Sequence, residues 1–385
     1  MNKKTDWLLW PNTIREQSNR IFSSIEHGKT HFLIDEKQWD YTVDVVWEEI
    51  KKNYPSFDIP FHSRWRHFDI GKQRLNKIKE QSTDSLLDLC FISVLLDAGA
   101  GSQWRYTYKD EDMSYGRSEG LALASLEMFE KGTFGLPYKV LGEGLRSLDL
   151  NELSTGLQIS TDNPIEGLEG RLNLLKALGE VLINSTTFKD NRPSGILNSL
   201  DSYEISGPEF LNKILIELKD IWPQGDQVDG QGYGDVWHYP PFGSRDDLTS
   251  YIPFHKLAQW LTYSIFELLI NNNYKINNIS KLTGLAEYRN GGLFIDTGYL
   301  RPRPGVDLNS KKKANDEIII EWRAITLVLL DKIHNSIRER LGKTEESFPL
   351  VRTLEGGTWK AGRELAFKLR EGIPPIDIIR DGTIF

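Results

Sequence analysis

The chain has 385 residues, of which 39% are hydrophobic and 26% charged, and this balance is that of a folded globular protein, not of a disordered one. Its formal net charge of −8 argues against a nucleic-acid partner, because phosphate contacts need a concentrated positive field, and its single cysteine excludes an intramolecular disulfide. No apolar run approaches the ~18 residues of a membrane span and the N-terminus lacks the apolar stretch of a signal peptide, so we expect a cytoplasmic protein without a membrane partner.

Helical periodicity dominates the sequence. Predicted helices occupy residues 39–52, 82–97, 118–131, 163–184, 210–221, 253–270, 321–341 and 358–370. Local signals support several of their ends, because Ser118 and Gly132 are placed as caps and Asn163 precedes an N-terminal proline. The chain is therefore expected to fold as a mainly α protein.

Strand signals are fewer and shorter. Residues 293–300 follow a run of Asn-Gly-Gly and indicate a hairpin arm, for which the β-branched run 318–320 is a candidate partner. Residues 376–379 are another candidate strand. We therefore expect a small β-hairpin or sheet element beside the helices.

The domain prediction is a single large helical globular domain. The polar stretch 191–208 is a weak candidate for a boundary, but candidate site segments occur on both sides of it. Residues 61–385 are therefore interpreted as one continuous unit, preceded by a peripheral helical segment at residues 1–60.

Two glycine-flanked turns in the first half of the chain carry charged residues. Asp97 lies in the last turn of an apolar helix, where the helix dipole disfavours a carboxylate, so it needs a partner. A tertiary salt bridge and a ligand are equally good interpretations. Arg117 and Glu119 flank a predicted helix start whose free N–H groups can bind an anion, although a well-capped helix explains the same pattern.

A third candidate segment spans residues 230–259. Asp235 and Trp237 follow a glycine, and further on His255, Gln259 and Tyr263 recur at every fourth residue of an otherwise apolar helix. Such polar groups are costly to bury without partners. They either line a polar cavity or form a satisfied network in the core.

A fourth candidate segment places Glu287, Arg289 and Asn290 directly before paired glycines. Turns require Asn and Gly but do not require Glu-Tyr-Arg, and this favours a functional interpretation. In a fifth segment, Thr358 is expected to cap a helix whose N-terminus is exposed by Gly356-Gly357. There Lys360 and Arg363 would supply charge to a phosphate or carboxylate cradle, although the spacing is not that of a Walker motif.

Several familiar catalytic signatures do not occur in the sequence. The seven histidines form neither HExxH nor a paired zinc spacing, so no metal is expected. There is no GxSxG elbow, and no dinucleotide fingerprint occurs in a strand–helix context, so no cofactor is expected. Carboxylate chemistry is the leading remaining option.

The same segments resemble the uracil-catabolism family long described as a domain of unknown function. The similarity runs in order from about residue 64 to residue 385 and includes SRWRHF (63–68), SVLLDAGAG (93–101), GRSEGLALAS (116–125), NPIEGLEGR (163–171), PFHKLAQWLTYS (253–264), TGLAEYRNGGLFID (283–296), EWRAITLVLLD (321–331), LEGGTWKAGRE (354–364) and DGTIF (381–385). The resemblance implies a route in which uracil is ribosylated, opened to a ribosylurea-type intermediate and broken down to urea. Such a route requires a step that cleaves an N-glycosidic bond.

The leading hypothesis is an N-glycosidase-like hydrolase that acts without a metal on ribosylurea, with or without a 5-phosphate. Its substrate would be a nucleoside-like or nucleotide-like small molecule, and no particular oligomeric state is predicted. The carboxylate is expected from Asp235 or Glu287, with Asp97 and Glu119 in reserve. The candidate substrate-binding residues are Arg64, Trp104, Arg117, Trp237, His255, Gln259, Arg289, Asn290, Trp359 and Arg363.

Two other interpretations remain open. One is a non-catalytic protein that senses or carries a nucleotide or base of the same pathway, using the same arginines and aromatic residues. The other is an amidohydrolase-like enzyme that opens a ring or a urea bond, and the sparse histidines count against a metal-dependent version of it.

Overall fold

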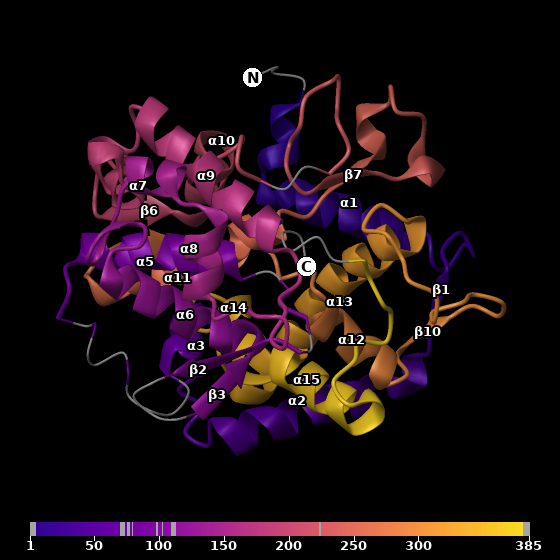
Figure 1. Ribbon diagram of the computed structural model, residues 1–385. Helices are drawn as coiled ribbons and strands as arrows, with labels where there is room; N and C mark the ends of the chain where they lie inside the picture. Colours follow the sequence, from indigo (N-terminus) through magenta and orange to yellow (C-terminus); the bar gives the residue numbers. More distant parts are fainter. Residues whose placement is uncertain are drawn as a thin grey trace. The chain divides into compact units, whose positions relative to one another are not determined.

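A computed structural model describes residues 5–69, 74, 78, 80–97, 99–101, 103–108, 113–222 and 225–379. Helices dominate this part of the chain, and the strands are two to four residues long (Figure 1). The predicted mainly α class with small β elements is confirmed. The terminal motif at 381–385 lies outside the described residues.

The chain divides into two compact units. Unit 1 combines Met1–His62, Gln224–Gln259 and Asn278–Ile379, and unit 2 contains Ser63–Pro223 and Trp260–Asn277. Helix α11 (Lys256–Asn271) belongs to unit 1 up to Gln259 and to unit 2 beyond it. Each unit is therefore built from segments that are far apart in the sequence.

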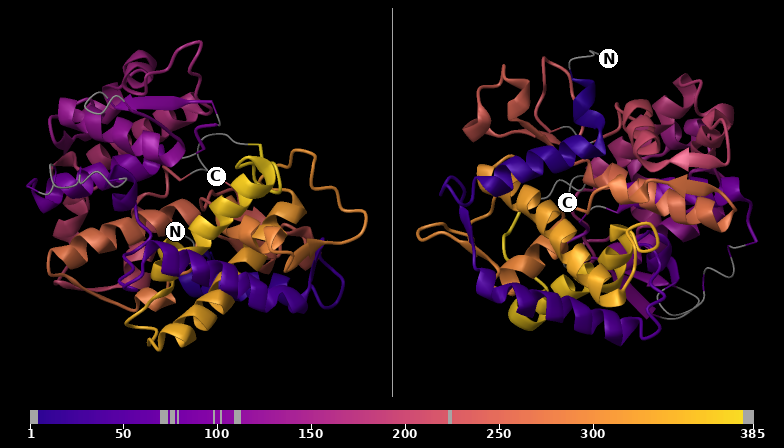
Figure 2. Two further views of the ribbon diagram at one scale, coloured as in Figure 1. Left: turned by 90° about the horizontal axis from the view of Figure 1, so that it is seen from below. Right: turned by 180° about the vertical axis from the view of Figure 1, so that it is seen from behind.

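The helices of unit 1 pack together through their apolar faces, which result from apolar residues recurring at helical spacing. Its elements are η1 (Asp6–Leu9), α1 (Pro11–Ser23), β1 (Phe32–Ile34), η2 (Glu36–Gln38), α2 (Trp39–Asn53), β7 (Val236–His238), η5 (Pro240–Phe242), η6 (Leu248–Ser250), β8 (Tyr251–Pro253), η7 (Ile279–Lys281), α12 (Tyr288–Asp296), β10 (Leu300–Pro302), α13 (Glu317–Leu341), α14 (Leu350–Thr353), the π-helical turn η8 (Leu354–Thr358) and α15 (Trp359–Arg370). Helix α1 lies along α13, as the right-hand view of Figure 2 shows, and α12 packs on α15. Strands β1 and β10 pair antiparallel, as do β7 and β8.

Unit 2 is organised around the apolar helix α5, whose residues from Leu87 to Leu96 are all buried. The elements of the unit are α3 (Trp65–Asp69), α5 (Thr83–Leu96), β2 (Arg105–Tyr108), β3 (Met113–Gly116), α6 (Arg117–Lys131), β4 (Gly135–Leu136), β5 (Lys139–Val140), α7 (Gly142–Ser147), α8 (Leu150–Gly156), α9 (Leu168–Asn184), η3 (Lys189–Asn191), η4 (Pro193–Ser199), β6 (Glu204–Ser206), α10 (Gly207–Glu217) and β9 (Lys275–Asn277). Helix α6 packs against both α5 and the β2–β3 hairpin. Strands β6 and β9 pair in parallel.

The predicted hairpin at residues 293–300 is wrong. The first half of that segment, residues 293–296, lies in helix α12, and the run 318–320 lies in helix α13. Leu300 begins β10, whose partner is β1. Gly291 explains the error, because a Cβ there would lie 2.8 Å from both Trp322 and Thr326 of α13. The paired glycines therefore allow close helix packing and do not form a turn. The candidate strand 376–379 contributes a single parallel bridge, from Ile378 to Lys312.

The predicted exposed helix start at Thr358 is also wrong. Thr358 has helical backbone angles of φ −64° and ψ −44° and makes no side-chain cap, because α14, η8 and α15 follow one another without a break. A Cβ on Gly357 would lie 2.4 Å from a methyl group of Val46. These glycines let the π-helical turn pack on α2, so the amides there are not free to cradle an anion.

A glycine later in the same helix gives a test of this packing. A Cβ on Gly362 would lie 2.1 Å from the carbonyl oxygen of Arg289. Gly362→Ala must therefore separate α15 from α12, and we expect it to destabilise the protein by about 1–3 kcal/mol. Thermal unfolding measures this loss. The exposed Glu364→Ala change on the same helix should leave the melting temperature nearly unchanged, and an equal loss in both variants would contradict the packing argument.

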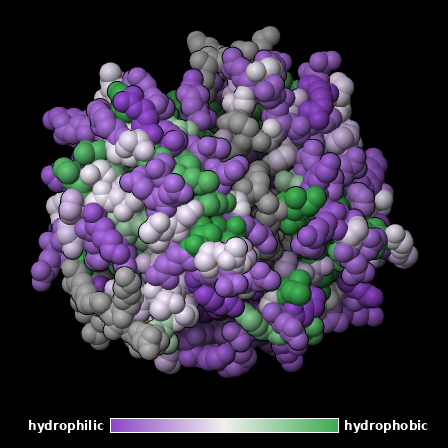
Figure 3. Space-filling model, viewed as in Figure 1, coloured by the Kyte–Doolittle hydropathy of each residue, from purple (hydrophilic) through white to green (hydrophobic). Residues whose placement is uncertain are grey.

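The face of the molecule in Figure 3 is mostly hydrophilic. On the face in Figure 3, hydrophobic residues occur in small groups among hydrophilic ones. Among the described residues, none of the helices combines the length and the apolar character needed to cross a bilayer.

Candidate functional site

Glu287 is the most unusual carboxylate of unit 1. It is the N-cap of α12, where its two oxygens accept hydrogen bonds from the backbone N–H groups of Arg289 (2.8 Å) and Asn290 (2.6 Å). Only 8% of the residue is exposed. Burial raises the pKa of Glu287 to about 7, although the cap hydrogen bonds and the nearby charges of Lys256 and His62 act in the opposite direction. This carboxyl group is therefore able to hold or release a proton near neutral pH.

Asp235, directly before β7, has the opposite character. Arg323 of α13 binds it with two hydrogen bonds of 2.7 Å, one to each carboxylate oxygen. The Trp237 indole also donates to it, at 2.7 Å. Burial favours the neutral form, but the Arg323 charge and these hydrogen bonds outweigh it and lower the pKa of Asp235 to about 2. Asp235 is therefore an ionised, firmly held carboxylate.

The two carboxylates belong to one connected network. The Nε atom of Arg323 donates to the carbonyl oxygen of Ala286, the residue before Glu287, at 3.2 Å. The backbone N–H of Lys256 donates to Asp235 at 3.1 Å, and the charge of Lys256 acts on Glu287. Glu287, which can be protonated near neutral pH, and Asp235, which is ionised there, thus share a polar region of unit 1.

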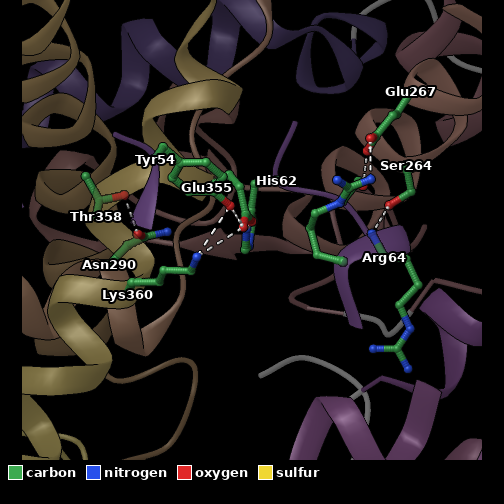
Figure 4. A network of polar contacts seen from close by, with 11 residues as sticks. Tyr54, His62, Arg64, Ser264, Glu267, Asn290, Glu355, Thr358 and Lys360 are labelled. Atoms are coloured by element: carbon green, nitrogen blue, oxygen red, sulfur yellow. Dashed lines mark hydrogen bonds and ion pairs between the residues drawn. The ribbon is translucent and has the colours of Figure 1, made fainter. Parts of the chain in front are cut away.

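A buried histidine–glutamate pair adjoins this network, and the sequence interpretation missed it. His62 Nδ1 lies 2.8 Å from Glu355 Oε2, and Tyr54 donates to Glu355 Oε1 at 2.7 Å. Lys360 Nζ is 3.7 Å from the same oxygen, and Figure 4 shows Glu355 between these three side chains. Burial favours a neutral Glu355, but the contacts with His62 and Lys360 outweigh it and lower the pKa of this carboxyl. A π-helical turn holds Glu355, and such turns are frequent at functional sites.

The other candidates around Glu287 are firmly held. Asn290 is fully buried, donates to the Leu285 carbonyl oxygen and accepts a hydrogen bond from Thr358 at 2.9 Å (Figure 4). The guanidinium of Arg289 donates to the Gly372 carbonyl oxygen and lies over the ring of Tyr288. These contacts fix the start of α12 and thereby the position of the Glu287 carboxyl.

The predicted helix 253–270 with His255 and Gln259 on one face is wrong at its start, because α11 begins at Lys256 and His255 precedes it. His255 Nε2 lies 2.9 Å from the Leu8 carbonyl oxygen, and burial lowers the pKa of this imidazole. The Gln259 amide donates to Thr283, while its Oε1 atom is buried without a hydrogen-bond partner among the described residues. His255 has a φ of +49°, which is strained for this residue type.

Trp359 and Arg363 belong to the same unit. The Trp359 ring lies 5.7 Å from that of His62, centroid to centroid, and the Arg363 guanidinium lies 5.5 Å from the Trp359 centroid. The site candidates in unit 1 are thus Asp235, Trp237, His255, Gln259, Glu287, Arg289, Asn290, Trp359 and Arg363.

The remaining candidates form a group within unit 2. Arg64 pairs with Asp97 at 3.1 Å and donates to Ser93, so Asp97 has the arginine partner that its place at a helix end requires. Glu119 acts on Arg64 through its charge, and Arg117 begins α6 with a φ of +53°. Trp104 has the contacts of a core residue, because it is fully buried and its indole donates to the Leu157 carbonyl oxygen.

Within the described residues, no group of three or more His, Cys, Asp and Glu side chains is arranged to hold a metal ion. The chemistry that this geometry can perform is proton transfer by Glu287 beside fixed charges.

Comparisons with known proteins agree with the motifs. A family model described as "Protein of unknown function (DUF1688)" matches residues 7–385. The chain is 38% identical over 410 residues to "Protein urg3" of Schizosaccharomyces pombe, which covers 98% of both chains. It is 34% identical over 429 residues to "Uracil catabolism protein 4" of Lachancea kluyveri, and the alignment covers 97% of both chains. These full-length similarities confirm the resemblance, and the chain belongs to the DUF1688 family.

Proposed function

We propose that this protein acts in uracil catabolism as an N-glycosidase-like hydrolase that releases urea from a ribosylurea-type intermediate, with or without a 5-phosphate. The relative named for uracil catabolism supports the pathway. The reaction rests on one observation, which is that unit 1 holds two buried carboxylates whose surroundings shift their pKa values apart, to about 7 for Glu287 and about 2 for Asp235.

The reaction breaks the bond between the anomeric carbon and a urea nitrogen and forms a bond from a water oxygen to that carbon. The departing nitrogen must gain a proton, because a urea anion is a poor leaving group. Glu287 in its protonated form supplies this proton. The attacking water then loses a proton, and this proton returns Glu287 to its protonated form.

The anomeric carbon carries positive charge in the transition state of such a reaction. Asp235 stays ionised and supplies fixed negative charge, while Arg323 holds its carboxylate in place. Trp359 and Arg363 are candidates for the sugar face and the phosphate. Asp97 and Glu119 remain reserve carboxylates within unit 2.

Incubation of the purified protein with synthetic ribosylurea and with its 5-phosphate tests the proposal. We expect stoichiometric urea and ribose, or ribose 5-phosphate, at a rate that EDTA does not change, because the proposed chemistry uses carboxylates. No urea at high enzyme concentration with either compound would overturn the hydrolase. If these compounds raise the melting temperature but are not turned over, the protein is a sensor or carrier instead.

A further inference from the structure

Unit 1 contains a second polar region, separate from the residues proposed for catalysis. It is a cavity of about 420 Å³ whose lining includes His31, His238, Arg245, Lys312 and the first residues of α13. We propose that this cavity is a binding site for a small oxyanion, that is, a molecule with a phosphate or carboxylate group. The proposal does not depend on the reaction assigned above.

The cavity and the proposed catalytic residues use opposite faces of the same two elements. Along β7, Asp235 and Trp237 are two residues apart and bonded to each other, so His238 points to the other face. Along α13, Arg323 follows Glu321 by about 200° of helix rotation, so these two side chains also point in opposite directions. The cavity is therefore a distinct site.

His31 is held with one ring nitrogen available. Its Nδ1 lies 3.0 Å from Glu321 Oε2, and its backbone N–H donates to the same oxygen at 2.7 Å. Tyr239 donates to the other oxygen of Glu321 at 2.8 Å, so a nearly fully buried carboxylate fixes the imidazole. Nε2 of His31 has no partner among the described residues, and 39% of the side chain is exposed.

His238 brings a second imidazole to the cavity. The residue is only 9% exposed, and its Nε2 lies 3.0 Å from the Gly243 carbonyl oxygen. Its Nδ1 makes no hydrogen bond with any residue that the structure describes, although the ring lines the cavity. In the imidazolium form this nitrogen carries a proton, so it can donate to an oxyanion in the cavity, as can Nε2 of an imidazolium His31.

The start of α13 adds donors to the same cavity. Its N-cap, Asp316, forms no side-chain cap, because its carboxylate accepts from the Lys313 N–H instead. The N–H groups of Glu317 and Ile318, which line the cavity, have no acceptor in the described part of the chain. The positive end of a 25-residue helix dipole thus adds to the charge of Lys312.

The acidic residues of the cavity lining differ in whether their carboxylates already have hydrogen-bond donors. Asp226 is already bound, because it accepts from Arg245 at 3.0 Å and from the His238 N–H at 3.0 Å. Asp316 accepts a hydrogen bond from the backbone N–H of Lys313. Glu317 is the acidic group without such a bond, so it should oppose anion binding. This sign distinguishes an oxyanion site from a site for a cation.

The test is titration calorimetry of the full chain with inorganic phosphate and with succinate, at constant ionic strength. We expect saturation below about 10 mM with at least one of them. Lys312→Gln should weaken binding about tenfold, as the loss of a charge-assisted contact does. Glu317→Gln should tighten it severalfold. Lys343→Gln, an equal charge change at an exposed position just beyond the C-terminal end of α13, should leave affinity within about twofold.

Three outcomes would overturn the oxyanion site. One is the absence of saturable binding of either probe. Another is equal weakening by Lys312→Gln and Lys343→Gln, which would reveal only a response to net charge. The third is weaker anion binding in Glu317→Gln. Because these variants change exposed or half-buried side chains, they are expected to fold, and circular dichroism checks this.

Discussion

Replacing Glu287 with glutamine is expected to lower the turnover of ribosylurea by about 10²–10⁴-fold. The amide keeps the size and shape of the side chain but cannot donate the proton that the departing urea needs. The measurement is urea release under single-turnover conditions, which separates chemistry from product release. Glu339→Gln, an exposed change on α13 of the same unit, is the matched control and should retain full turnover.

The direction in which the rate changes with pH tests whether the protonated form of Glu287 is the active one. Burial raises the pKa of Glu287 to about 7, and the proposed role uses the protonated form. The single-turnover rate of the wild type should therefore fall as the pH rises through about 7. If the rate instead rises through that range, the ionised carboxylate is the active form and Glu287 would be a base that activates water.

Stability provides the control that separates catalysis from helix capping. Because the folded pKa of Glu287 lies above its unfolded value of 4.5, the protonated group stabilises the fold below pH 4.5, and this contribution is lost as the pH rises through about 7. The loss amounts to about 3 kcal/mol. Glu287→Gln lacks this titration, so its melting temperature relative to wild type should increase between pH 5 and pH 8. A variant that is less stable at every pH but turns over normally would show that Glu287 is only a cap.

The helices could be predicted from the sequence because their signals are local. Apolar spacing located α2, α5, α6 and α13 to within a few residues. Glycine was misinterpreted at Gly291 and Gly357, because the same residue serves a turn and a close helix contact. The partner at that contact lies elsewhere in the chain, on α13 or on α2. Only the folded packing distinguishes these two uses.

The sequence indicates only some residues of the candidate site, for the same reason. Glu287 is indicated by the sequence because Glu-Tyr-Arg is not needed beside glycines, and that signal lies within one segment. The pair of His62 and Glu355 is separated by 293 positions, and no spacing rule connects such residues. Asp235 appeared equivalent to Glu287 in the sequence. The difference between them comes from Arg323, which is 88 positions away from Asp235.

That difference leads to the second large effect, which is on stability. Asp235→Asn leaves the guanidinium of Arg323 buried without its counter-charge, since the side chain of Arg323 is 2% exposed. Breaking a buried pair in this way costs about 3–5 kcal/mol. We expect a melting temperature lower by on the order of 10 °C. Asp226→Asn removes the charge that pairs with Arg245, whose side chain is 60% exposed, while the amide oxygen can still accept from the His238 N–H, so it should cost below about 1 kcal/mol.

The free energy of unfolding at low pH provides a second test of the ion pair between Asp235 and Arg323. The pKa of Asp235 is lowered to about 2, so its contribution is present above its unfolded value of 3.8 and is lost as the pH falls towards 2. The difference in unfolding free energy between wild type and Asp235→Asn should therefore shrink below pH 4. A constant difference across this range would mean that the packing of the side chain, and not its charge, stabilises unit 1. In that case Asp235 would no longer qualify as the fixed anion of the proposed reaction.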